Sequence, residues 1–120
     1  MKKIEAPGKS LGQLEAEISE SMIKFELEYM GRGPKRTRTH ILDDMIVIRL
    51  EGVLTPAELQ LAKDDQGIRL LKEVRTNLIE QAGEILKALI QGIMGRPVLS
   101  IHSDISSKRG ERIIIFVLDK

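Results

Sequence analysis

The side chains with the most chemical potential gather first between residues 31 and 40. This stretch holds four cations and a histidine: Arg32, Lys35, Arg36, Arg38 and His40. Gly31 and Gly33 expose backbone N–H groups beside these cations, so the stretch could hold a phosphate or a carboxylate. The same composition is typical of a solvated turn followed by an edge strand that its charges protect from unwanted pairing. The sequence leaves both interpretations open.

A second polar group lies between residues 100 and 107. His102 and Asp104 are two positions apart, so on a strand they would share one face. They could act as a base with its orienting acid, or as two ligands of a metal. A third group would have to come from Asp43, Asp44 or His40, and only if the two segments meet. The chain has just two histidines, and a structural histidine is the alternative.

No sequence frame for catalysis accompanies these residues. The serines at 103, 106 and 107 lack a Gly-x-Ser-x-Gly frame. Neither a phosphate-binding P-loop nor a dinucleotide glycine fingerprint occurs. We therefore expect a protein that is not an enzyme, with no catalytic residue, no metal site and no resident cofactor.

Composition argues against nucleic acid as a partner. The 19 Lys and Arg residues nearly balance 18 Asp and Glu residues, so net charge does not favour a polyanion. Two Phe, one Tyr and no Trp leave few aromatic faces on which bases could stack. Apolar residues make up 42% of the 120 residues, which is enough for one hydrophobic core.

Cysteine usage and hydropathy predict a cytoplasmic protein. The absence of cysteine suits a reducing compartment. Residues 1–12 are polar and lack the apolar stretch of a signal peptide. No run approaches the roughly 20 apolar residues of a membrane-spanning helix. We expect any work at a membrane to take place at its surface. We also expect residues 1–10 to be flexible and residues 11–120 to form one domain.

The first predicted element is a helix over residues 11–30. Ser10 is a suitable N-cap, and Gln13 completes a capping box. Gly31 then favours a left-handed stop, and Pro34 prevents the helix from resuming. Apolar residues recur on one face at helical spacing, namely Leu11, Leu14, Ile18, Met22, Phe25 and Tyr29.

Residues 37–51 change to a strand pattern rich in β-branched side chains. Asp43-Asp44 is the best turn candidate, which makes 37–42 and 45–51 a hairpin. One continuous strand is the alternative, because Asp-Asp is a weaker turn signal than Asn-Gly. A short helix over 56–63 follows, with Thr55 as its N-cap and Pro56 at its first position.

A longer helix is predicted over residues 66–94. At about 1.5 Å per residue it would be roughly 43 Å long. A compact domain of this length is only about 27 Å across. Such a helix must traverse the domain or project from it. Its apolar stripe consists of Leu71, Val74, Leu78, Ala82, Ile85, Leu89 and Ile93, flanked by Leu70, Ile79, Leu86 and Ile90.

The last two predicted elements are strands over 98–105 and 112–118, joined by a polar turn. The second is almost wholly aliphatic, which is typical of a central strand covered on both faces. The expected fold class is α+β, with an antiparallel four-stranded sheet of two β-hairpins packed on two long helices. Its order is α-β-β-α-α-β-β.

Two similar turns, Met30-Gly31-Arg32 and Met94-Gly95-Arg96, each follow a long helix and precede a hairpin. They divide the chain into two helix–hairpin units, without showing whether these are a true repeat. The apolar stripes of the long helices exceed what one small sheet can cover. We therefore expect a homodimer formed through these helices.

Several motifs, taken in order, resemble a known bacterial family. They are Gly31-Arg32-Gly33-Pro34, Asp43-Asp44, residues 50–58 (Leu-Glu-Gly-Val-Leu-Thr-Pro-Ala-Glu) and residues 102–106 (His-Ser-Asp-Ile-Ser). The resemblance spans about residues 14–118. It is to the MpsC-like family, named after the third component of a Na+-translocating, membrane-potential-generating system and formerly a domain of unknown function.

The resemblance implies an accessory role beside membrane machinery for cation or inorganic-carbon transport. It supplies no catalytic residues. Without a membrane span, the chain would act as a peripheral subunit or regulator. The alternative function is a small module that binds an anionic ligand through residues 32–38. The residues expected to contact a ligand or partner are Arg32, Arg36, Asp43, Asp44, Glu51, His102 and Asp104.

Overall fold

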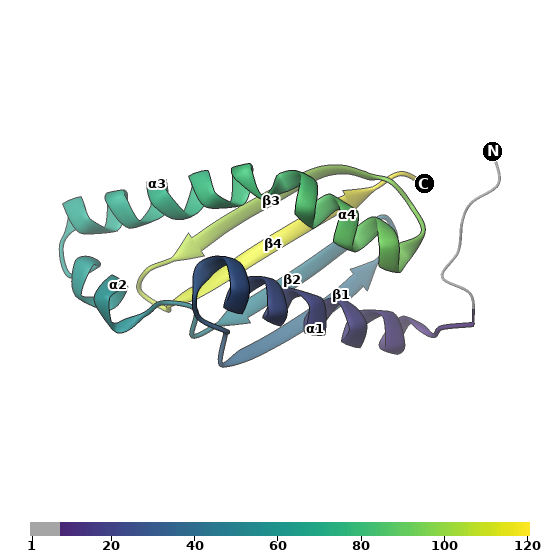
Figure 1. Cartoon of the computed structure of the whole chain (residues 1–120), viewed down its shortest axis with the longest axis horizontal. Coiled ribbons are helices and arrows are strands. Elements are labelled where there is room, and N and C mark those ends of the chain that lie inside the picture. Colours follow the sequence, from purple (N-terminus) through teal and green to yellow (C-terminus); the bar gives the residue numbers. More distant parts are fainter. Residues whose placement is uncertain (1–7) are drawn as a thin grey trace.

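The computed structural model describes residues 8–120 as two layers, a sheet and a layer of helices (Figure 1). The elements in chain order are α1 (Leu11–Met30), β1 (Arg36–Leu42), β2 (Met45–Glu51), α2 (Pro56–Leu61), α3 (Asp65–Gln81), α4 (Gly83–Met94), β3 (Val98–Ser106) and β4 (Glu111–Leu118). This confirms the predicted α+β class. The expected flexibility of residues 1–10 concerns a segment that lies largely outside the described residues.

Local signals set the bounds of α1 as predicted. The Ser10 backbone N–H donates to the Gln13 side chain at 2.9 Å, and the Gln13 N–H donates to the Ser10 hydroxyl at 3.2 Å. At the other end Gly31 has φ 87°, a left-handed conformation that a side chain would disfavour. Gly95 ends α4 in the same way, with φ 69°. Both Met-Gly-Arg turns are therefore helix stops.

The four strands form one antiparallel sheet in the order β1-β2-β4-β3. The predicted first hairpin is confirmed, with Leu42 opposite Met45 across the Asp43-Asp44 turn. Asp43 has φ 58°, a conformation that Asp tolerates better than most residues. The two hairpins place β2 and β4 at the centre and β1 and β3 at the edges.

The prediction of one helix over 66–94 is wrong, because the helix is divided at Ala82. Ala82 has ψ 5° instead of the helical value near −42°, so α3 ends and α4 begins in a new direction. A straight helix of that length could not follow a short twisted sheet. Gly83, a weak helix former, lies at the bend. In Figure 1, α2 and the start of α3 project beyond the end of the sheet as an arm.

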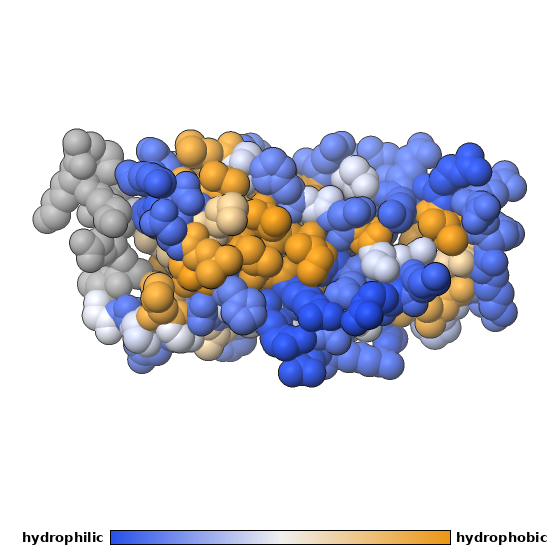
Figure 2. Space-filling model, turned by 180° about the vertical axis from the view of Figure 1, so that it is seen from behind, coloured by the Kyte–Doolittle hydropathy of each residue, from blue (hydrophilic) through white to orange (hydrophobic). Residues whose placement is uncertain are grey.

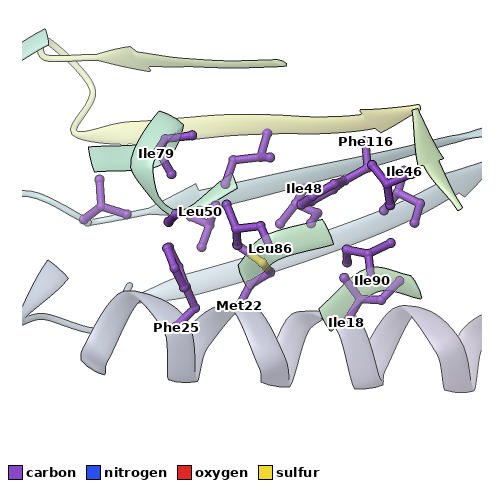
Figure 3. Close-up of a cluster of buried hydrophobic side chains, with 14 of the residues drawn as sticks. Ile18, Met22, Phe25, Ile46, Ile48, Leu50, Ile79, Leu86, Ile90 and Phe116 are labelled. Carbon is purple, nitrogen blue, oxygen red and sulfur yellow. The ribbon is translucent and has the colours of Figure 1, made fainter. Parts of the chain in front are cut away.

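The core fills the space between the two layers. Figure 3 shows Ile18 and Met22 of α1 pointing toward Ile48 of β2, with Leu86 and Ile90 of α4 beside them. All five side chains are fully buried. Each contributes roughly 1.5–3 kcal/mol through burial, so the helix layer is held to this face mainly by apolar contact.

The prediction that residues 112–118 are covered on both faces is wrong, although the strand is central. The inward residues Ile114, Phe116 and Leu118 are buried under the helices. The alternate residues Ile113, Ile115 and Val117 face the other side of the sheet and stay partly exposed. All described helices lie on one side, so an aliphatic strand has one uncovered face (Figure 1).

Candidate functional site

The outer face of the sheet, the face away from the helices, carries a contiguous group of apolar side chains. Register places Leu42, Met45 and Val117 in one row across β1, β2 and β4. Val47 and Ile115 lie in the next row. We define the apolar patch as the outward side chains Leu42, Met45, Val47, Ile113, Ile115 and Val117. Leu42 and Met45 are 54% and 37% exposed. The patch occupies the end of the sheet nearest the Asp43-Asp44 turn.

Figure 2, which views the molecule from behind, shows hydrophobic residues gathered on this face and hydrophilic residues beside them. Exposed apolar residues also occur on the helices, singly or in pairs one turn apart, such as Ile23 with Leu27 and Leu70 with Val74. Small groups of this kind are ordinary on a protein surface. Six adjacent apolar side chains on a sheet face, two of them exposed and four half-buried, are typical of an interaction surface.

The other end of the outer face carries a network of charged residues, here called the outer network. Arg49 Nε donates to Glu111 Oε1 at 2.8 Å, and Arg109 Nε donates to Glu111 Oε2 at 2.7 Å. Arg38 lies 3.4 Å from Glu51. Hydrogen bonds from Arg49 and Arg109 lower the pKa of the Glu111 carboxyl, which keeps it ionised. Its short, well-partnered bonds hold this end of the face in one arrangement.

Four of the predicted contact residues lie on this outer face. Arg36 and Glu51 are opposite each other in register at the charged end. His102 and Asp104 lie on the edge strand β3. One row runs Arg38, Arg49, Ile113 and Asp104, at the border between the patch and the charged end. The neighbouring row runs His40, Val47, Ile115 and His102. The face therefore joins residues from both hairpins.

The proposed pair of His102 and Asp104 takes other partners. His102 Nε2 lies 3.0 Å from the Ser100 hydroxyl. Asp104 accepts a hydrogen bond from the Ile105 N–H at 2.8 Å and lies 3.8 Å from Lys72. His40 is separated from His102 by two whole strands. This arrangement does not bring a base, its acid and a third group to one point.

The remaining predicted residues occupy turns. Arg32 Nε donates to the Gly52 carbonyl at 3.4 Å and so connects the end of α1 to the end of β2. Asp43 and Asp44 form the first hairpin turn, where Lys120 lies 3.5 Å from Asp43. The Lys35 N–H donates to the Glu51 carbonyl at 2.8 Å and Arg36 lies opposite Glu51 in register, so the basic stretch runs along the end of β2.

A second cluster of charges, here called the inner network, is sealed between the layers. Glu26 of α1, Arg75 of α3 and Arg112 of β4 are 0%, 2% and 1% exposed. Glu26 lies 3.6 Å from Arg75 Nη1 and 3.6 Å from Arg112 Nε. These are ion pairs longer than good hydrogen bonds. Four polar atoms of this cluster have no hydrogen-bond partner among the described residues. They are the two carboxylate oxygens of Glu26 and the Nε and Nη2 atoms of Arg112.

Burial sets the electrostatics of the inner network. Desolvation raises the pKa of Glu26, and the charges of Arg112 and Arg75 offset part of that effect. Desolvation likewise lowers the pKa of Arg112, with Glu26 opposing the change. Because isolated charges are costly in the interior, removing one member would leave an opposite charge buried without its neighbour.

Arg75 also joins the inner network to the arm. Its guanidinium donates to both carboxylate oxygens of Glu58 on α2, at 2.9 Å and 2.7 Å, and to the Val53 carbonyl at 3.0 Å. Burial alone would raise the pKa of Glu58, but hydrogen bonds from Arg75 and Thr55 bring it below its usual value. The network thus fixes where α1, α2, α3 and β4 meet.

Sequence reasoning missed Glu26, Arg75 and Arg112. Their signal was positional, because each occurs where its element's own period predicts an inward apolar residue. Arg112 precedes Ile114 and Phe116 by two-residue steps, and Arg75 lies four residues from both Leu71 and Ile79. A charged residue at such a position indicates either that it has a buried partner of opposite charge or that the inward face of the element has been assigned wrongly.

Among residues 8–120, no helix is both long and apolar enough to cross a bilayer. Over the same residues, no group of three or more His, Cys, Asp or Glu side chains is placed to hold a metal ion.

The fold and its outer face define a class of protein: a single two-layer α+β unit with an uncovered apolar sheet face. Residues 10–120 match the model of the family described as Na+-translocating membrane potential-generating system (MpsC). The chain belongs to this MpsC family.

Two relatives come from Bacillus subtilis (strain 168). The uncharacterized protein YbcI is 44% identical over 110 residues, covering 92% of this chain and 89% of the relative. The uncharacterized protein YrhF is 27% identical over 105 residues, covering 87% and 86%. No solved structure matches the chain.

Proposed function

We propose that this protein is a non-enzymatic accessory or regulatory subunit that works through contacts with other proteins. Its place is cytoplasmic and peripheral to the membrane, beside the transport machinery for cations or inorganic carbon that the family resemblance implies. The observation that carries the proposal is the apolar patch. Covering an aliphatic face that is exposed to water lowers the free energy by about 25 cal/mol per Å² of apolar area.

The arrangement of polar residues supports binding more than chemistry. The charged side chains of the outer face are already joined in ion pairs, such as Arg49 with Glu111 at 2.8 Å. Paired charges beside an apolar centre are typical of a recognition surface, where the charges select the partner and fix its orientation. The alternative, an anion-binding module, has less support, because Arg32 already donates to the Gly52 carbonyl and Arg38 already pairs with Glu51.

We also propose that the protein is a homodimer. The predicted contact through the long helices stays a prediction. The inward apolar stripes of α1 and α4, including Ile18 and Ile90, are buried in the chain's own core. The outer face of the sheet is a contiguous apolar surface left for a partner.

The test of the accessory role is cosedimentation of the purified chain with membrane vesicles. Vesicles are prepared from cells with and without the membrane components of the family's transport system. We expect binding only when those components are present. Val47→Asp places a charge within the apolar patch and should weaken binding about tenfold or more, because it disrupts the dimer that we propose as the binding form. Ala88→Asp, on the exposed side of α4, is the matched control and should bind normally. Equal binding to both kinds of vesicle would contradict the proposal.

A further inference from the structure

The pattern of β4 indicates that the outer face is covered in the working protein. Residues 112–118 are aliphatic at six of seven positions, counting Phe116 with them, yet the helices cover only every second one. An antiparallel strand with one face in water ordinarily alternates apolar and polar residues. Ile113, Ile115 and Val117 break that alternation on the outer face. The sequence of β4 therefore fits a sheet buried on both sides.

We propose that the cover is a second copy of this chain, packed outer face to outer face about a two-fold axis that crosses the strands at the apolar patch. This inference rests on the proposed interaction role and names the partner of that surface. The product is a four-layer assembly with helices on both outsides and two sheets about 10 Å apart at its centre. Such a contact is isologous, so the same patch must fit itself.

The spacing of the rows makes the face self-complementary. Successive outward residues lie about 6.8 Å apart along an antiparallel strand. The axis would pass between the row of Val47 and Ile115 and the row of Met45 and Val117. Each of these two rows then lies over the other row of the second copy. Apolar side chains therefore meet apolar side chains across the central strands β2 and β4.

The same axis brings opposite charges together. The row of Arg38 and Arg49 lies about 10 Å from the axis on one side, and the Asp43-Asp44 turn lies about 7 Å from it on the other, within reach of the long arginine side chains. A rotation about this axis keeps β1 over β1 and β2 over β2. The arginines of one copy therefore lie over the acidic turn of its mate.

The charge balance of the two ends agrees with this pairing. The charged end of the outer face holds four arginines, Arg36, Arg38, Arg49 and Arg109, against three acids, Glu51, Glu111 and Asp104. The turn holds two aspartates with Lys120 beside one of them. The charged end of the outer face therefore has a net positive charge, and the turn has a net negative charge. An unrelated partner would need an apolar centre with acidic residues on one side and basic residues on the other. A second copy related by the two-fold axis has this arrangement by symmetry.

Sedimentation of the full chain tests the inference. We expect a particle of about 27 kDa, twice the 13.5 kDa of the chain, at micromolar concentration. Val47→Asp and Leu42→Asp should both yield monomers, while Ala88→Asp stays dimeric. Leu42 is 54% exposed, so its variant should fold even if Val47→Asp does not. A monomeric parent chain, or a dimer that survives the Leu42 variant, would overturn the inference.

A charge exchange tests the orientation of the two copies. Asp44→Arg and Arg38→Asp should each raise the dissociation constant about tenfold, because each places like charges opposite one another. The double variant restores opposite charges in both copies and should return to within about threefold of the parent. A double variant as weak as the two single changes combined would overturn the proposed axis.

The vesicle experiment keeps the two proposals separate. A monomeric chain that still binds vesicles only when the transport components are present would overturn the dimer and leave the accessory role standing. A dimer with the predicted charge exchange but no component-dependent binding would support the dimer and contradict the accessory role.

Discussion

Glu111 and Arg112 are consecutive residues of β4, yet they belong to two different ion networks. Because side chains alternate along a strand, Glu111 enters the outer network and Arg112 the inner one. The outer bonds are short, with Arg109 and Arg49 at 2.7 Å and 2.8 Å from Glu111. The inner pairs are 3.6 Å long and leave buried polar atoms without partners.

The two networks have different roles. The outer network is accessible and well bonded, so its charges can be shared with a partner at small cost. The inner network is sealed, and each of its charges is uncompensated once a neighbour is lost. We interpret the inner network as the joint that positions the arm, and the outer network as the oriented rim of a contact surface.

The largest expected effect comes from opening the inner network. Glu26→Gln removes the carboxylate that faces Arg112 and should lower the free energy of unfolding by about 3–5 kcal/mol. The double variant Glu26→Leu with Arg112→Met replaces the pair by apolar residues and should recover most of that loss. Urea unfolding monitored by circular dichroism measures both. If Glu26→Gln cost less than about 1 kcal/mol, the inner network would not be the joint described here.

A second comparison uses identical residues on the two faces of β4. Ile114→Ala removes a fully buried side chain and should cost about 2–5 kcal/mol at any protein concentration. Ile115→Ala, on the outer face, should cost less in the monomer and progressively more as concentration rises and the face is covered. Urea midpoints over a hundredfold range of concentration measure this. An Ile115→Ala cost that never changes with concentration would argue that the outer face stays bare.

A smaller effect is expected from pH. Glu58 and Glu111 have pKa values lowered in the folded state, from an ordinary 4.5. Their stabilisation is therefore complete above about pH 4.5 and lost as pH falls through their lower folded values. Glu26, whose pKa is raised, acts with the opposite sign and offsets part of the loss. The parent should lose stability between about pH 5 and pH 3, and Glu58→Gln should lose less. An unchanged profile in that variant would argue against the Arg75–Glu58 contact.

Much of the fold could be predicted from local signals. The bounds of α1 follow from Ser10, Gln13 and Gly31, because caps act within one turn and need no tertiary context. The Asp43-Asp44 hairpin followed from strand patterns on both sides of a weak turn. The α+β class followed from the order of these elements.

The remainder depended on packing that no local pattern contains. The apolar band of residues 66–94 is wide, so helical periodicity alone fits two different buried faces. The sequence favoured a face through Val74 and Leu78, whereas the structure buries the face through Arg75 and Ile79. The bend at Ala82 is imposed by the sheet beneath it. The predicted contact residues Arg36, Glu51, His102 and Asp104 share a face only because β2 pairs with β4. The networks at Glu111 and Arg112 arise from that same pairing.

In the dimer that we propose, a second copy covers the outer face of the sheet. Because the chain has no cysteine, Val47→Cys introduces a single thiol on that face. Ala88→Cys introduces one on the exposed side of α4. Maleimide labelling rates are measured as the protein is concentrated from below to above the dimer dissociation constant. We predict that the thiol at position 47 becomes at least tenfold slower while the thiol at 88 is unchanged. Equal rates at position 47 across the whole range would contradict the claim.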